Sequence, residues 1–285
     1  MRWLRLPWLL VSLLILLYST SSVGYAAQEG ILRVSGSTTV NPVAADAAEA
    51  LRREGLQITV DTQGGSAGGI AQLAAGQIDI AMSSTPIDDE DREQFPSIDF
   101  VSTEIGRDAV GIVVRREVAD GGLTSLTREQ LQALFEGRVS NWQELGGPDL
   151  AVFVYDKEPG RGTREVLDKY LYPDGDVPQP QGDNFAIVGG NEELRSKLLS
   201  TPGSVGPLSV AFVTGQPQLK AIAVDGVEPT SAHIQDGSYP MSRPLLLVTN
   251  GPPQGATARF VDYVVSEPGQ ALVRKHGYLD LAALR

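Results

Sequence analysis

The stretch SGSTTV, residues 35–40, joins the apolar segment ILRV (31–34) to the helix-like segment NPVAADAAEALRREG (41–55). The apolar segment predicts a β-strand, so SGSTTV is expected to be a turn between a strand and a helix. One hydroxyl side chain is enough to cap a helix, and four are present here. The other hydroxyl groups are therefore expected to face water or to bind a ligand.

Strand-like and helix-like segments alternate along the rest of the chain. Residues 56–62 and 78–84 predict strands, residues 67–77 and 88–95 predict helices, and the alternation is typical of α/β layers around a mainly parallel sheet. Thr124 or Thr127 is the expected N-cap of a later helix. Further strands are predicted at residues 109–116, 150–156, 205–213, 219–226 and 243–250, further helices at 126–137, 163–172, 191–203 and 256–277, and a loop at 172–184.

The first 26 residues predict a secretory signal peptide. Arg2 and Arg5 precede the apolar run WLLVSLLILLY (8–18), and small residues follow up to Ala26, after which cleavage is expected. The alternative is an uncleaved membrane anchor, although the apolar run is shorter than the roughly 20 residues of a typical span. The mature chain is therefore expected outside the cytoplasm, most simply in a periplasm.

The composition excludes several classes of site and partner. The chain has 285 residues, two histidines, no cysteine and a formal net charge of −12 at pH 7. Without cysteine there can be no disulfide, no thiolate metal site and no lipid-modified cysteine anchor. Two histidines alone form no zinc-binding cluster, so neither a metal nor a cofactor is expected. The negative charge argues against nucleic acid and anionic membranes as partners.

Three more strand-to-helix junctions resemble the opening stretch in composition. They are TQGGSAGG (62–69), SST (83–85) and DKEPGRGT (156–163). The carboxyl ends of parallel strands meet at one edge of a sheet, where free N–H groups at helix starts favour an anion. At a single junction, ordinary helix capping is the better explanation, but four such junctions together favour ligand binding. The cations Lys157, Arg161 and Arg164 oppose a helix dipole, however, and so predict an anion nearby.

A serine hydrolase is the alternative function that the residues suggest. The sequence Gly64-Gly65-Ser66-Ala67-Gly68 matches the nucleophile-elbow pattern G-x-S-x-G. A hydrolase also needs a base, and only His233 and His276 are available. We interpret His276 as a surface residue near a helix end, so Ser66 is expected to act as a hydrogen-bond donor.

Several longer segments together resemble a known family. They are SGSTTVNPVA, QGGSAGGIAQLAAGQIDIAMSSTPI, LTREQLQALFEGRVSNWQELGG, GRGTREV and PGSVGPLSV. Over residues 31–285 the chain resembles the periplasmic phosphate-binding proteins of phosphate ABC transporters. The resemblance implies a type II periplasmic binding protein fold, in which two α/β lobes are joined by two crossing strands. The crossings would lie near Val113 and Leu246, with one lobe formed by residues 27–112 and 245–285 and the other by 113–244.

The resemblance also implies which residues bind the ligand. Hydroxyl groups and glycines at three of the junctions match positions that contact the anion in that family. The matched residues are Ser37, Thr38, Thr39, Ser66, Gly162 and Thr163.

Three site positions depart from the family pattern. Ser84 stands where many members have an aspartate that accepts the proton of the ligand, Lys157 where an arginine is usual, and Arg161 where a serine is usual. The number of cations is preserved or raised, so anion binding is still expected.

Asp108 is the nearest substitute for the missing aspartate. It precedes the predicted crossing strand and is expected to face the cleft as the acceptor of the ligand O–H. Its alternative role is a surface ion pair with Arg107 or Arg115.

The sequence therefore predicts a monomeric extracytoplasmic binding protein rather than an enzyme. It would capture inorganic phosphate between two lobes and deliver it to a membrane-embedded ABC permease. Another oxyanion, such as sulfate, is the alternative ligand.

Overall fold

The computed structural model of the protein describes residues 30–285. The predicted signal peptide, residues 1–26, lies outside this range. Among the described helices, none combines the length and the apolar character that crossing a membrane would need.

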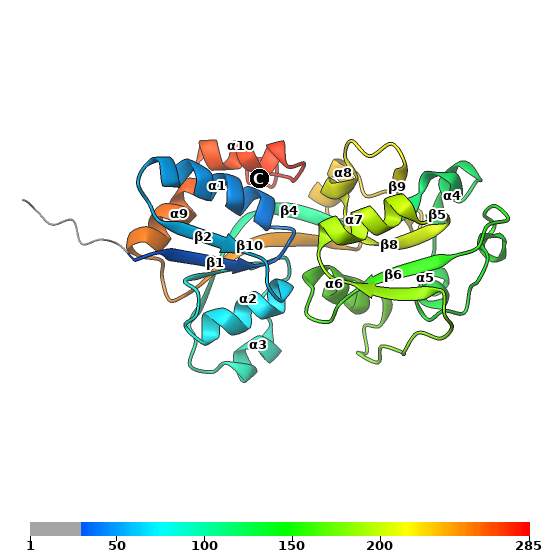
Figure 1. Cartoon of the computed structure of the whole chain (residues 1–285), viewed down its shortest axis with the longest axis horizontal. Helices are drawn as coiled ribbons and strands as arrows, with labels where there is room; N and C mark the ends of the chain where they lie inside the picture. The colour runs from blue at the N-terminus through cyan, green and yellow to red at the C-terminus, as the bar shows by residue number, and fades with distance from the viewer. Residues whose placement is uncertain (1–29) are drawn as a thin grey trace, which may run out of the picture.

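Two α/β lobes lie side by side and share one curved sheet (Figure 1). In lobe I, β1 pairs in parallel with both β2 and β3, which confirms the predicted parallel arrangement around the SGSTTV turn. The N-terminal elements of lobe I are β1 (Leu32–Gly36), α1 (Asn41–Arg53), β2 (Ile58–Asp61), α2 (Gly65–Ala74), β3 (Ile80–Ser83) and α3 (Asp89–Gln94).

Two long strands cross from one lobe to the other. They are β4 (Phe100–Arg115) and β10 (Ser242–Asn250), which are antiparallel to each other. Strand β4 pairs with β10 from Phe100 to Ala109 and with β8 from Val110 onward, so its partners change at this point. The expected fold class, two α/β lobes joined by two crossing strands, is confirmed. The lobe boundaries expected at 112/113 and 244/245 lie close to this change and stay a prediction.

Lobe II is formed by the central part of the chain. Strand β6 pairs in parallel with β7 and β8, so the β6–α6 and β7–α7 turns lie at the same edge of the sheet. Its helices are α4 (Arg116–Asp120), α5 (Arg128–Phe135), α6 (Gly162–Leu171), α7 (Asn191–Ser200) and α8 (Ser231–Gln235), with 3₁₀ turns at Trp142–Leu145 and Val210–Val213. Its strands are β5 (Ser125–Leu126), β6 (Phe153–Lys157), β7 (Phe185–Val188), β8 (Ser204–Ser209) and β9 (Leu219–Val224).

The chain returns to lobe I in α9 (Gly255–Val265) and α10 (Glu267–Lys275), which pack against α1. Each lobe has its own apolar core. Leu32, Val34 and Phe260 belong to the core of lobe I, while Trp142 and Leu167 belong to a core of lobe II. Each lobe is therefore packed around its own core, and the crossing strands connect the two.

One helix cap follows the sequence prediction closely, whereas the start of one strand departs from it. Thr127 caps α5, because its hydroxyl accepts the N–H of Gln130, and Thr124 does not. The strand predicted to begin at Ala109 begins nine residues earlier, at Phe100. The first half of β4 contains polar residues such as Glu104 and Arg107, so an apolar pattern does not predict it as a strand. Its hydrogen bonds with β10 hold it in the extended conformation.

Candidate functional site

A small cavity lies where the two lobes meet. Turns of lobe I (β1–α1, the start of α2, the end of β3) face the β6–α6 and β7–α7 turns of lobe II. Its volume is about 10 Å³, which is the room that one water-sized sphere needs. The residues that line it are Ser37, Thr38, Thr39, Gly65, Ser66, Ser84, Lys157, Arg161, Gly162, Thr163, Gly189 and Asn191.

Lobe I contributes a cluster of buried hydroxyl groups. Ser37 Oγ donates to Ser84 Oγ at 3.0 Å, and the hydroxyls of Ser66 and Ser84 are 3.3 Å apart. The backbone N–H of Ser84 also donates to Ser66 Oγ at 3.2 Å. Ser66 lies in the first turn of α2, where N–H groups have no acceptor within the helix. The three turns therefore present O–H and N–H donors to one point.

Lobe II contributes two cations and the start of α6. Lys157 at the end of β6 is 1% exposed, and its Nζ donates to the carbonyl oxygens of Gly190 at 2.8 Å and Gly189 at 3.2 Å. Burial, together with the charges of Arg161 and Arg243, lowers the pKa of Lys157 to about 7. Arg161 reaches the cavity from the N-cap of α6 and donates to Glu158 at 2.6 Å and 3.1 Å.

Arg243 on β10 was not predicted from the sequence. Its guanidinium contacts hydroxyl groups that line the cavity. Its side chain is 1% exposed, and its guanidinium donates to Thr163 Oγ1 at 2.9 Å in lobe II and to Thr39 Oγ1 at 3.0 Å in lobe I. A weaker contact of 3.4 Å reaches Ser84 Oγ. The signal was an arginine at the start of a buried apolar strand (SRPLLLV), where a charge must have a partner.

The expectation that Asp108 faces the ligand needs correction. Its Oδ2 accepts from Arg243 at 2.8 Å and 3.0 Å, and its Oδ1 accepts from Ser209 at 2.8 Å. Asp108 is completely buried and does not line the cavity. Burial raises the pKa of this carboxyl, and the Arg243 guanidinium opposes the shift. Neither expected role, ligand acceptor or surface ion pair with Arg107 or Arg115, describes its place.

The other residues expected at the site do line the cavity, with three additions, Gly65, Gly189 and Asn191. Asn191 Nδ2 at the start of α7 donates to Thr39 Oγ1 at 2.9 Å across the lobes, and Gly189 supplies a carbonyl to Lys157. The segment IVGGNEE (187–193) has the same strand–glycine–helix composition as the other junctions and was the missed signal. Arg164, in contrast, does not line the cavity and pairs with Asp156 and Asp168.

The lobes are in contact around this cavity. Ala67 N–H of lobe I donates to the carbonyl of Gly160 in lobe II at 3.1 Å. A Cβ on Gly162 would lie 2.5 Å from Ser84 Oγ and 2.7 Å from Ser66 Oγ. Only glycine allows α6 to approach this closely, so the arrangement is a closed one.

The geometry does not support a hydrolytic role for Ser66. Its hydroxyl contacts Ser84, whereas His276 Nε2 lies 2.9 Å from Asp46 and His233 Nδ1 lies 2.8 Å from the carbonyl of Glu228. Within residues 30–285, no three or more acidic or histidine side chains are placed to hold a metal ion.

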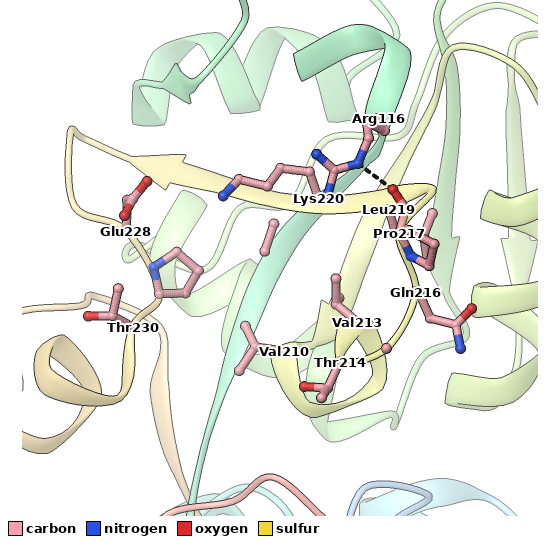
Figure 2. A pocket seen from close by; sticks show the side chains of 13 residues that line it. Arg116, Val210, Val213, Thr214, Gln216, Pro217, Leu219, Lys220, Glu228 and Thr230 are labelled. Carbon is pink, nitrogen blue, oxygen red and sulfur yellow. Dashed lines mark hydrogen bonds between the residues drawn. The ribbon is translucent and has the colours of Figure 1, made fainter. Parts of the chain in front are cut away.

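A larger cavity of about 500 Å³ lies on lobe II, away from these donors (Figure 2). It lies beside β9, and Arg116 Nε there already donates to the carbonyl of Pro217. Both charged and apolar residues line it, among them Lys220, Glu228 and Val210. Only one lobe lines it, so closure of the two lobes could not enclose a ligand there.

Two lobes that close over a cavity lined with donors from both define a two-lobed solute-binding protein. A family model described as a PBP superfamily domain matches residues 21–268, and the chain belongs to this family.

Individual relatives carry more specific names. The chain is 27% identical over 270 residues to the phosphate-binding protein PstS of Bacillus subtilis, covering 94% of this chain and 86% of that one. It is 26% identical over 262 residues to PstS of Borreliella burgdorferi, with 89% and 91% covered. Both relatives are named as binding proteins, in agreement with the family of this chain, and the hydrolase alternative is not favoured.

Solved structures agree with this assignment. One from Clostridium perfringens, described as a phosphate ABC transporter substrate-binding protein with bound phosphate, has a TM-score of 0.76 and 27% identity, covering 88% of this chain and 99% of that one. An ABC-type phosphate transport receptor from Vibrio cholerae has a TM-score of 0.70 and 26% identity, with 87% and 99% covered.

The first prediction concerns the buried ion pair. Asp108→Asn should lower the free energy of unfolding by about 3–5 kcal/mol, because it leaves the buried guanidinium of Arg243 without a counter-charge. Chemical denaturation followed by circular dichroism measures this. Ser209→Ala is the matched control, since it removes one hydrogen bond to the same carboxylate and should cost about 1–3 kcal/mol. A stable Asp108→Asn protein with altered anion selectivity would mean that the carboxylate reaches the ligand after all.

Proposed function

We propose that the chain captures inorganic phosphate between its two lobes outside the cytoplasm and delivers it to a membrane-embedded ABC permease. The observation that carries this proposal is the convergence of hydroxyl groups, helix starts and cations from both lobes on one cavity. Relatives with the names and ligands given above support phosphate as the anion.

In the proposed complex each lobe binds a different side of the anion. The hydroxyls and the α2 start of lobe I donate from one side, and the α6 start with its cations donates from the other. The residues proposed to contact phosphate are Ser37, Thr38, Thr39, Ser66, Ser84, Lys157, Arg161, Gly162 and Thr163. Arg243 holds two of these hydroxyls in place, and Asp108 holds Arg243.

The cellular setting is part of the same proposal. Export by the signal peptide of residues 1–26 would place a monomeric binding protein where a permease can receive its ligand. The charge of −12 keeps such a protein from nucleic acid and from anionic membrane surfaces. Lobes bounded near 112/113 and 244/245 would then open to release phosphate.

The test of this function is calorimetric titration of the purified mature protein. Phosphate should bind with one site, and molybdate and an organic phosphate should bind more weakly. Sulfate is the informative competitor, because no carboxylate lines the cavity to repel it. Absence of heat with phosphate, or tighter binding of sulfate, would contradict phosphate capture.

Arg161 is the cation whose removal should weaken binding most directly. A hydrogen bond to a charged group is worth about 1.5–3 kcal/mol, so Arg161→Ala should weaken phosphate binding roughly 10- to 150-fold. Calorimetry measures this against Arg164→Ala as control. Both side chains are 16% exposed, but Arg164 pairs with Asp156 and Asp168. Equal losses in the two variants would place the anion elsewhere.

Binding should also close the molecule. A cavity of about 10 Å³ cannot admit a tetrahedral oxyanion unless the lobes first part. A ligand held from both sides favours the closed state through its differential affinity. Small-angle scattering should therefore show a smaller radius of gyration with saturating phosphate than with chloride at the same ionic strength. An unchanged radius would argue for a ligand held by one lobe.

A further inference from the structure

A site that prefers phosphate to sulfate needs an acceptor for a proton of the ligand. Here neither carboxylate nor imidazole lines the cavity. Ser84, which stands where many members of the resembled family have an aspartate, already accepts from Ser37 and lies within 3.4 Å of an Arg243 nitrogen. Its remaining role is that of a donor.

The neighbouring hydroxyls are partly committed in the same way. Thr39 Oγ1 accepts from both Asn191 and Arg243, at 2.9 Å and 3.0 Å, so both of its lone pairs are used. Thr163 Oγ1 accepts from Arg243 and Ser66 Oγ from the N–H of Ser84, which leaves each of them one lone pair. None of these hydroxyls changes its charge near neutral pH, whereas the amine of Lys157, which also lines the cavity, does.

Lys157 has the geometry of such an acceptor. Its Nζ is bonded to Cε and donates to two carbonyl oxygens, those of Gly189 and Gly190. A tetrahedral nitrogen has one position left, and Lys157 lines the cavity. In the charged form this position holds a third N–H, and in the neutral form it holds a lone pair.

The surroundings decide between the two forms. Arg161 at the start of α6 and Arg243 on β10 disfavour the charged form, while Glu193 on α7 and Asp156 on β6 favour it. Each of these groups has a partner of its own: Arg161 pairs with Glu158, Arg243 with Asp108, Asp156 with Arg164, and Glu193 accepts the N–H of Gly189. Burial disfavours the charge most strongly, and the resulting pKa of about 7 makes both forms accessible near neutral pH.

We infer that Lys157 selects a protonated anion: its amine, fixed by the carbonyls of Gly189 and Gly190, accepts the O–H of phosphate at its fourth position. This inference rests on the proposed function and names the residue that sets its specificity. If the proton crosses, a P–O–H bond breaks, an N–H bond forms, and the total charge of the pair is unchanged. Sulfate carries no proton, so it can bind only after Lys157 has taken one from water.

The two anions should therefore respond differently to pH. Above the pKa of Lys157, the dissociation constant of sulfate should rise about tenfold per pH unit, because binding requires uptake of one proton. The dissociation constant of phosphate should rise less, because the phosphate ion brings the proton with it. The ratio of the sulfate to the phosphate dissociation constant should thus grow about 5- to 30-fold between about pH 7.5 and about pH 9 in wild type.

Lys157→Arg is the matched variant, because a guanidinium stays charged and has no lone pair to offer. In this variant, the ratio of the sulfate to the phosphate dissociation constant should be smaller and independent of pH over the same range. Wild-type calorimetry in two buffers of different ionisation enthalpy gives a second readout that needs no variant. Near pH 8.5, uptake should be about one proton per sulfate and clearly less per phosphate.

The outcomes separate this inference from the proposed function. If neither anion binds, phosphate capture itself is wrong. If phosphate binds but the wild-type ratio is independent of pH, as the Thr38 hydroxyl or another non-titrating acceptor predicts, Lys157 is not the selecting residue. Equal proton uptake for both anions would overturn the inference in the same way.

Discussion

The buried ion pair between Arg243 and Asp108 is the interaction on which the rest of the site depends. The two residues lie directly opposite each other where β10 pairs with β4, at the crossing between the lobes. A buried ion pair adds little net stability, because removing two charges from water costs about as much as their attraction returns. Here the ion pair mainly holds the Arg243 guanidinium in place, and that guanidinium donates hydrogen bonds to Thr39 of lobe I and Thr163 of lobe II. The crossing strands therefore fix the relative places of donors that belong to different lobes.

Apart from the bonds of Arg243, the contacts between the lobes are individually weak. They include a backbone hydrogen bond from Ala67 to Gly160, the side-chain bond from Asn191 to Thr39, the exposed ion pair of Lys169 with Asp88, and the close approach of Gly162 to Ser84. A typical hydrogen bond contributes about 0.5–1.5 kcal/mol net, so these contacts hold the closed state by only a few kcal/mol. An anion that accepts several charge-assisted bonds from both lobes adds more than this. The equilibrium is thus one that a small ligand can shift.

The sequence predicted the parts of the site that local chain geometry determines. A turn between a parallel strand and a helix places its hydroxyls, glycines and N–H groups at the strand ends, and Ser37, Ser66 and Gly162 lie there for that reason. Arg243 and Asp108 are 135 residues apart, and their contact depends on the register of β10 against β4, which no local pattern encodes. The mistaken place of Asp108 has the same origin, because its direction depends on which strand lies beside it.

Local electrostatics also explains how a protein of net charge −12 can hold an anion. Exposed charges more than about 8 Å away are largely screened at physiological ionic strength, whereas groups inside a desolvated cavity interact in a lower dielectric. Near the cavity, the fixed charges of Arg161 and Arg243 are each paired with an acidic residue, so the resident positive charge is small. Burial and the two arginines lower the pKa of Lys157 to about 7, so its charge changes over the neutral range. A site built in this way can adapt its charge to that of the incoming ion, which a site of permanently charged arginines could not do.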